Sequence, residues 1–390
     1  MKKVFVSSAL SALLVLPAAA LEVYSGDNAT LSVYGAIKGY VGMGENAQVG
    51  MGPAGFLFGV QNNSNIGFDV VADKFKAKVE FGAIENDPFG TANGAVAPLR
   101  YLWGSYDTGL GTILIGKANT PTTDIFSTGV LNTDTALNGF GGLSTATRRL
   151  QAQYNVAGLS LALISDYIAE LGVVSPQPNA NSSSTMPRIA LSYTIYNGSN
   201  PLFQIAGTYK RFTGESVGNP TTTNGAVTSS DPLDAWHISV GTKPTFGNSF
   251  VSLFGFYGKN QDAYGETNTF YNSGAWNHGI VDGLVTTGTG RNIKRAGGKA
   301  ELGIGLSKDA TFTIGAGYQE TFVENQQGIY KKYKSVGVFA QVPYKVNANF
   351  TLTPVVGWFQ TSGVNGATIT NAVKNKVTSV VAAGRVMWSF

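Results

Sequence analysis

The residue types that catalyse proton transfer or covalent chemistry are scarce in this chain of 390 residues, which has two histidines and no cysteine. His237 lies in the alternating run 236–240, on the polar face of a predicted strand. His278 lies in a loop and has no evident partner in the sequence. Loop carboxylates such as Asp262 and Glu266 are too few for the full coordination set of a hard cation. We therefore expect no enzyme site, no metal and no bound cofactor.

Charged side chains instead recur at every second residue of predicted strands. In 74–81 the odd positions are apolar, and so Lys78 and Glu80 share the opposite face. Lys38 lies opposite the apolar face of the first strand, and Arg149 shares the phase of two nearby glutamines. A strand with lipid on one side and a polar lumen on the other has this pattern. A solvated strand near a barrel rim would have it too.

The elements that must position these charges are strands. Alternation with a period of two predicts about sixteen of them, with boundaries uncertain by several residues. They lie near 29–42, 56–72, 74–84, 98–107, 111–117, 147–156, 158–166, 187–196, 201–211, 233–243, 249–258, 297–307, 311–322, 332–345, 348–360 and 377–390. The predicted architecture is all-β.

The connections between the strands alternate between tight turns, such as 73–74 and 108–111, and long loops rich in Gly, Asn, Thr and Pro. Outer-membrane barrels have this asymmetry, with short turns on the periplasmic side and long loops outside, whereas a soluble sandwich has no reason to keep it. We therefore predict a transmembrane antiparallel β-barrel with both ends in the periplasm. Residues 259–296 could form another hairpin, which would raise the count to eighteen strands.

Both ends of the chain support export to an outer membrane. Residues 1–20 combine a basic start, a short apolar run and Ala18-Ala19-Ala20, which predicts a signal peptide and leaves 21–390 as one barrel domain. The last strand, 377–390, alternates apolar even positions with polar odd ones and ends on an aromatic residue. Aromatic residues near the predicted strand ends suit interfacial girdles or ordinary packing; they are Tyr40, Phe56, Trp358, Phe359, Trp388 and Phe390.

The composition is compatible with a barrel and excludes other classes. The mean hydropathy of +0.04 is far below that of helical membrane proteins, and it is near the average of alternating lipid-facing and lumen-facing residues. Without cysteine, no disulfide or thiolate site can form. Removing Lys2 and Lys3 leaves 25 basic residues against 23 acidic ones, which is no nucleic-acid footprint. Composition alone does not separate a barrel from a large soluble β protein.

Several stretches resemble the general diffusion porins of Gram-negative bacteria. The mature start, 21–35 (LEVYSGDNATLSVYG), is similar to their opening strand. Residues 100–104 (RYLWG) and 109–121 (GLGTILIGKANTP) are similar to the strands that lead into their third loop, and 148–154 (RRLQAQY) to the return strand. The resemblance implies that the third loop folds into the barrel and narrows it, and that three barrels associate into a homotrimer.

The resemblance also implies which residues form the constriction. Lys117 and Arg149, with Arg148 as the alternative in register, match the basic wall opposite the third loop. The lysine position of the family's first strand matches Ala36, with the charge here two residues later at Lys38. The family's arginine on the second strand has no clear counterpart here. The basic wall is correspondingly thinner.

The third loop, 118–146, supplies the acidic side of the expected constriction. It contains Asp124 and Asp134 and no basic residue. Carboxylates facing the basic wall across a narrow gap would create a transverse field that disfavours apolar solutes. Lys78 and Glu80 complete the expected set of pore residues. An aspartate in a loop can also simply cap a turn, which is the alternative role for both.

Together these observations predict an outer-membrane porin that passes ions and small hydrophilic solutes passively. A channel specific for a sugar, a phosphate or an organic acid is the main alternative, because it would share the barrel and differ only in its lumen. An adhesive or structural role through the loops is a third possibility. The expected partners are outer-membrane lipid and lipopolysaccharide, and no nucleic acid. Basic residues beside two long loops, such as Lys294 and the run 331–334, would meet anionic lipopolysaccharide or solvent.

Overall fold

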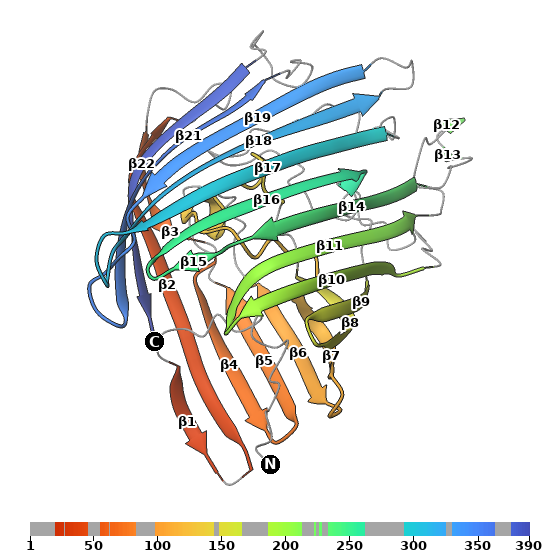
Figure 1. Ribbon diagram of the computed structural model, residues 1–390, viewed down its shortest axis with the longest axis vertical. Coiled ribbons are helices and arrows are strands. Elements are labelled where there is room, and N and C mark those ends of the chain that lie inside the picture. The colour runs from red at the N-terminus through yellow and green to blue at the C-terminus, as the bar shows by residue number, and fades with distance from the viewer. Residues whose placement is uncertain are drawn as a thin grey trace.

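A computed structural model places consecutive strands side by side in an antiparallel sheet that closes on itself (Figure 1). The residues that the structure describes are 20–26, 28–45, 55–61, 63–82, 98–143, 148–165, 186–212, 222–223, 226–227, 233–261, 292–324, 330–362 and 376–390. Apart from Ala20, the expected signal peptide at 1–20 lies outside them. Within the described residues, no helix has the length and apolar character needed to cross a membrane.

The first half of the sheet contains eleven strands. They are β1 (Leu21–Ser25), β2 (Thr30–Glu45), β3 (Gly55–Val60), β4 (Asn65–Ala72), β5 (Phe75–Gly82), β6 (Leu99–Asp107), β7 (Thr112–Asn119), β8 (Arg148–Val156), β9 (Leu159–Ile164), β10 (Arg188–Asn197) and β11 (Asn200–Phe212). The segment between β7 and β8 contains the short helix α1 (Leu131–Asp134).

The second half continues in the same antiparallel order. Its strands are β14 (Leu233–Thr242), β15 (Thr245–Phe246), β16 (Ser249–Lys259), β17 (Asn292–Gly305), β18 (Thr311–Glu324), β19 (Tyr330–Gln341), β20 (Tyr344–Lys345), β21 (Phe350–Ser362) and β22 (Lys376–Ser389). A separate two-stranded sheet pairs β12 (Thr222–Thr223) with β13 (Ala226–Val227).

The wall of the barrel has sixteen strands, as alternation predicts. The large sheet contains twenty named strands, of which β1, β15 and β20 are short additions at the turns, and β3 and β4 are two halves of one strand that pairs with β2. The alternative of eighteen strands is wrong for the wall, because β16 pairs directly with β17 from Phe250↔Gly303 to Lys259↔Lys294. Residues 262–291, where the extra hairpin was expected, lie outside the described residues.

The first and last wall strands close the barrel. β2 pairs with β22 from Ala36↔Ser389 to Glu45↔Val380. At the end of this seam, Gly35 and Phe390 each donate a backbone N–H to the other's carbonyl oxygen, at 2.9 and 3.0 Å. Closure leaves no unpaired strand edge in the wall, which a membrane requires. The terminal Phe390 and β1 both lie near the lower end of the barrel in Figure 1.

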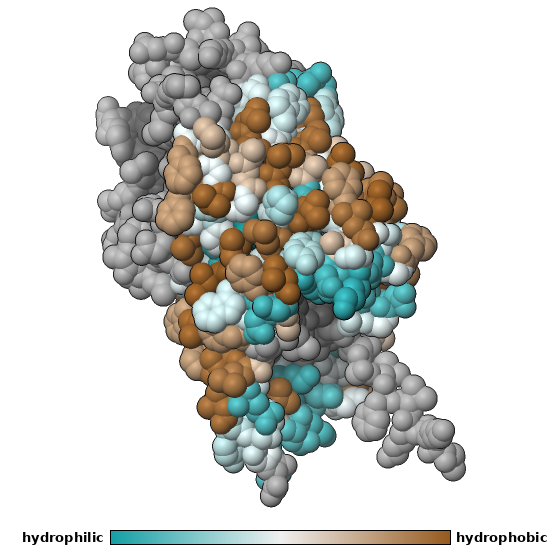
Figure 2. Space-filling model, turned by 90° about the vertical axis from the view of Figure 1, so that its left-hand side faces the viewer, coloured by the Kyte–Doolittle hydropathy of each residue, from teal (hydrophilic) through white to brown (hydrophobic). Residues whose placement is uncertain are grey.

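The two faces of the wall differ as the sequence predicts. On β22, Val380 and Trp388 are exposed on the outside, whereas Ser379, Arg385 and Ser389 are buried on the inside. The same alternation gives the other strands an apolar exterior, part of which Figure 2 shows in brown. A closed barrel with an apolar outside and a polar inside is suited to a lipid bilayer. The chain is built as an outer-membrane barrel.

Candidate functional site

The third long connection lies inside the barrel. Its residues 120–143 leave β7, cross the inner faces of β14 to β19, β21 and β22, reach β2, and return to β8. Figure 1 shows part of this path as yellow-brown chain within the barrel. The inward-folded third loop expected from the sequence is therefore present. We call residues 120–143 the inner loop.

The tip of the inner loop is held by charge. The Asp134 carboxylate lies 2.5 Å from the Lys38 ammonium of β2, and its other oxygen accepts a hydrogen bond from the Arg385 guanidinium of β22. The amide of Asn63 also donates to it at 2.5 Å, from the interruption between β3 and β4. Asp134 has a φ of +67°, a left-handed conformation that aspartate tolerates better than most residues. Three elements thus meet at one carboxylate.

These contacts set the charge state of Asp134. Burial alone would raise the pKa of its carboxyl, but the charges of Lys38 and Arg385 and the hydrogen bonds from Lys38 and Asn63 outweigh burial and hold the pKa below its usual range. Asp134 is therefore an anion at neutral pH. It neutralises part of the positive charge of the wall at β2 and β22.

A second ion pair holds the start of the inner loop. The Asp124 carboxylate lies 2.8 Å from the ammonium of Lys299 on β17, and both side chains are almost completely buried. Lys299 also lies 3.4 Å from Glu301, whose carboxylate accepts hydrogen bonds from the backbone and the hydroxyl of Thr128. Asp124 accepts a further bond from the backbone N–H of Phe126 at 3.0 Å, as a turn-forming aspartate does. The expected capping role and the ion pair therefore coexist.

Between the two ion pairs, apolar packing and backbone contacts hold the inner loop. Leu131, Leu137 and Phe140 are buried against Phe339 and Phe359, and the two rings Phe140 and Phe359 lie 4.9 Å apart. Tyr40 also belongs to this cluster and donates its hydroxyl hydrogen to a loop carbonyl. Of the two roles left open for the aromatic residues, packing applies to Tyr40 and Phe359, which face the inner loop. Phe56, Trp358 and Trp388 are exposed outside, where a girdle would lie.

Glycines on the inner wall make room for the inner loop. A Cβ atom at Gly317 of β18 would lie 2.1 Å from the Phe140 carbonyl oxygen, and one at Gly337 of β19 would lie 2.9 Å from the Phe140 Cβ. A glycine of the inner loop has the same role: a Cβ at Gly141 would lie 2.1 Å from the carbonyl oxygen of Gly298 on β17. The main chain of the inner loop thus lies directly on the wall.

The opposite arc of the wall, from β4 to β8, contains a separate charge network. Lys78 lies 3.2 Å from Asp69 and 4.3 Å from the centre of the Tyr34 ring. Glu80 accepts a hydrogen bond from the Tyr34 hydroxyl at 2.8 Å and pairs with the guanidinium of Arg100 at 2.5 Å. The structure therefore places Lys78 and Glu80 on one inner face, as predicted. Their ion-pair partners come from the wall.

Arg148 and Arg149 begin β8, next to the end of β7. Arg149 shares the inward phase of Gln151, and the Arg148 guanidinium lies 5.3 Å from the centre of the Tyr101 ring. Lys117 has the outward phase of β7, and its ammonium donates to the carbonyl oxygen of Leu99 at 2.7 Å. These three cations lie at one end of adjacent strands, because Ala118 pairs with Arg149 and Asn119 with Arg148.

The loop carboxylates and this basic end contact different parts of the wall. The sequence suggests that Asp124 and Asp134 face Lys117 and Arg149, but in the structure their ion-pair partners are Lys299, Lys38 and Arg385. Alternation places Arg385 on the inner face of the last strand, so its orientation was predictable. The sequence does not predict the roles of Lys299, Glu301 and Asn63, because no local pattern reveals which part of the wall the inner loop crosses.

Two features bear on catalysis. His237 is buried on the inner face of β14, as the alternation predicts. Residues 214–218 read Gly-Glu-Ser-Val-Gly, which has the G-x-S-x-G spacing of a hydrolase nucleophile, and they lie outside the described residues. That motif acts at a turn from a strand to a helix, whereas the next described elements here are strands.

Comparison with solved structures finds this fold in outer-membrane proteins, among them a channel and a porin. The outer-membrane channel DcaP of Acinetobacter baumannii has a TM-score of 0.64 at 12% identity, with 95% of this chain and 100% of that chain covered. OmpT of Vibrio cholerae in its in-vitro folded trimer form (TM-score 0.55, 13%) and the anion-selective porin from Comamonas acidovorans (0.53, 13%) each cover 93% of this chain and 100% of their own. No family model and no curated protein matches the sequence. The chain has a porin-like fold.

Proposed function

We propose that this protein is an outer-membrane porin, a channel and not an enzyme, through which ions and small hydrophilic solutes diffuse passively. The observation that carries the proposal is the inner loop, which is fixed by ion pairs across a closed barrel with a polar interior. A loop that is held inside a polar barrel narrows the water-filled path, and it leaves the path open beside the part of the wall that the loop does not cover. The narrow path is the gap between the inner loop and the arc of β4 to β8.

The constriction favours anions. The two aspartates are the only charged residues of the inner loop, and both are paired with wall cations on the side that the loop covers. On the opposite arc, Arg100 pairs with Glu80, and Arg148 lies against the Tyr101 ring. Arg149 follows Arg148 with the inward phase of β8. A basic lining of this kind raises the local concentration of anions. The transverse field between acidic loop and basic wall is therefore weaker than the sequence suggests, and net positive charge dominates.

A planar bilayer measurement under a salt gradient tests both the channel and its preference for anions. Large conductance steps and a reversal potential displaced toward the anion equilibrium are expected for the purified protein. The double variant Arg148→Gln/Arg149→Gln should lower the anion-to-cation permeability ratio at least about threefold, because it removes two charges from the narrow path. Lys308→Gln, a fully solvated change at the turn end, is the matched control.

The possible outcomes separate the alternatives. Silent membranes would overturn the channel proposal, and cation selectivity of the unmodified protein would overturn the anion preference. Small currents that one class of solute blocks would favour a substrate-specific channel. Hydrolysis of an ester by the protein, lost in Ser216→Ala, would instead establish a nucleophile at 214–218.

We also propose that three barrels associate. The trimer form of the structurally similar Vibrio cholerae OmpT supports this, as does the exterior beside the seam, where Phe56 and Phe58 of β3 are more than two-thirds exposed and their rings stack 6.4 Å apart. Native mass spectrometry of the protein in detergent should give three times the mass of the mature chain. A monomer mass in mild detergent would contradict this assembly.

A further inference from the structure

Lysines form a row on the outside of the barrel, at the end of the strands that carries the long loops. Lys259 of β16 lies directly opposite Lys294 of β17, and Lys294 is next to Phe322 of β18, which pairs with Lys332 of β19. Lys334 follows two residues later on the same outer face. Like charges directly opposite each other on adjacent strands repel. A bound anion would remove this cost.

One acid partly balances the row. The Glu320 carboxylate lies 2.7 Å from the Lys332 ammonium and accepts a hydrogen bond from the Tyr318 hydroxyl. Glu320 therefore links the lysine row to the wall below it. Among the described outward residues of this row, positive charge remains in excess.

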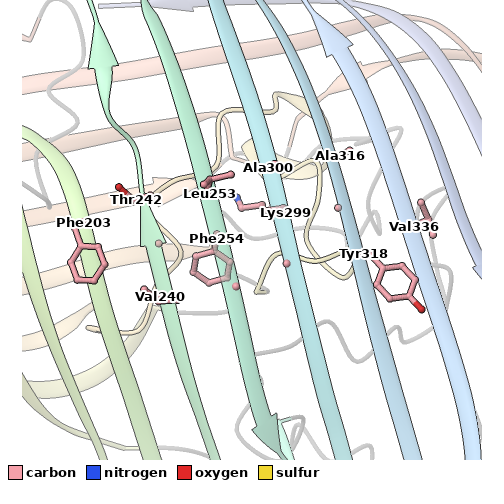
Figure 3. A pocket seen from close by; sticks show the side chains of 14 residues that line it. Phe203, Val240, Thr242, Leu253, Phe254, Lys299, Ala300, Ala316, Tyr318 and Val336 are labelled. Atoms are coloured by element: carbon pink, nitrogen blue, oxygen red, sulfur yellow. The ribbon is translucent and has the colours of Figure 1, made fainter.

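An apolar groove of about 640 Å³ lies below the row, separated from it on β16 and β17 by the pair Tyr257 and Ala296. Its floor is made of small residues, with Gly255 opposite Gly298 and Ala300 opposite Ala316. Larger side chains border the groove, and Figure 3 labels five of them: Phe203, Val240, Leu253, Tyr318 and Val336. Empty space on a lipid-facing wall loses van der Waals contacts, and so an acyl chain is the natural filling.

The spacing of the two features fits one amphipathic lipid. Gly298 is four residues along β17 from Lys294, a distance of roughly 13 Å at about 3.3 Å per residue. Lys259 and Lys332 are three strands apart, which corresponds to roughly 14 Å across the sheet. That width accommodates two phosphates on one rigid headgroup better than a single phosphate. Lysine ammoniums bind phosphate through charge-assisted hydrogen bonds.

We propose that this face is a binding site for a doubly phosphorylated, multiply acylated glycolipid of the lipid A type, whose phosphates contact the lysine row and one of whose acyl chains lies in the groove. The proposal rests on the proposed function, since the long-loop end must face the outer leaflet. It adds a specific site to the general expectation of contact with membrane lipid.

Binding of purified lipids to the refolded, lipid-free protein tests the site. Native mass spectrometry should rank diphosphoryl lipid A above monophosphoryl lipid A, and both above phosphatidylglycerol. Lys259→Gln/Lys294→Gln removes two cations that repel each other, so it should fold normally and weaken diphosphoryl lipid A binding at least about tenfold. Lys308→Gln, at the opposite end of the barrel, is the matched control.

The groove is tested separately from the charges. Ala316→Leu fills the floor and should weaken binding of the acylated lipid, whereas Ala340→Leu changes an outward residue of β19 outside the groove and should not. Equal binding by the double lysine variant, or equal affinity for phosphatidylglycerol, would overturn the proposal. A change of oligomeric mass in Ala316→Leu would assign the groove to a protein interface instead. Normal conductance of these variants would keep the channel proposal intact whichever result is found.

Discussion

Asp134 is the residue on which the position of the inner loop depends most directly. Replacing it in Asp134→Asn leaves Lys38 and Arg385 close together without a counter-charge. We expect the free energy of docking of the inner loop to weaken by about 1–3 kcal/mol. This is less than for a fully enclosed ion pair, because the side chain of Asp134 is 37% exposed. Hydrogen exchange of the amides in 120–143 should accelerate, and single-channel current noise should increase.

Asp309→Asn provides the control for this variant. Asp309 is an exposed aspartate of a tight turn, 3.9 Å from Lys308, and its replacement should change neither observable. Unchanged exchange in Asp134→Asn would mean that the apolar packing of Leu131, Leu137 and Phe140 holds the inner loop without help from charge.

The lowered pKa of Asp134 gives a second prediction at the residue scale. A carboxyl whose pKa is lower in the folded state contributes stability that is present above its ordinary pKa, about 3.9, and is lost as the pH falls through the lower folded value. The inner loop should therefore remain docked at pH 4. Conductance noise recorded from pH 7 down to pH 3 measures this. Release of the loop with a midpoint above pH 4, absent from Asp134→Asn, would contradict the assigned charge state.

At the scale of elements, the inner loop fits because the wall beneath it lacks side chains. In Gly317→Ala the new methyl would lie 2.1 Å from the Phe140 carbonyl oxygen, and so the loop must move away from β18. Overpacking of this kind costs about 1–3 kcal/mol, and we expect it to lower the docking free energy of the loop by that amount. Because the loop then moves into the pore, the conductance should change measurably.

Gly39→Ala is the matched control for that change. Its new methyl would have only the Gly59 carbonyl oxygen nearby, at 3.8 Å, which is ordinary van der Waals contact. The control should keep the conductance and the thermal stability of the unmodified barrel. If Gly317→Ala does the same, the inner loop is not seated on β18 as the structure indicates.

Strands and loop differ in how far the sequence predicts them. The alternation along β22 involves neighbours two residues apart, and so it reveals the strand, its faces and the inward position of Arg385. The partners of the inner loop are remote: Asp134 and Arg385 are 251 residues apart, and Gln341 and Thr128 are 213. Which wall the loop would cross, and hence the role of Lys299, depends on those distant contacts and on the inward glycines, for which the sequence carries no local signal.

At the scale of the whole molecule, the seam between β2 and β22 makes the chain a closed barrel. Gly35 and Phe390 form a hydrogen-bonded pair, and so the next pair, Ala36 and Ser389, is of the non-hydrogen-bonded type, whose Cα atoms are close enough for a disulfide. Because the protein has no cysteine, no native thiol competes with an introduced pair within the chain. The double variant Ala36→Cys/Ser389→Cys should therefore form one intramolecular bond on mild oxidation.

That bond would close a loop of roughly 350 residues. By chain entropy it should stabilise the folded barrel by up to about 5–6 kcal/mol, since the effect grows with the logarithm of the loop length. The oxidised barrel should then need a higher temperature to unfold in sodium dodecyl sulfate, and a reductant should abolish the gain. Ala36→Cys/Met387→Cys places the second sulfur two residues along the strand, and it should oxidise far more slowly. Faster oxidation of this diagonal pair would show that the seam has a different register, and every inward residue assigned to β22 would then have to be reassigned.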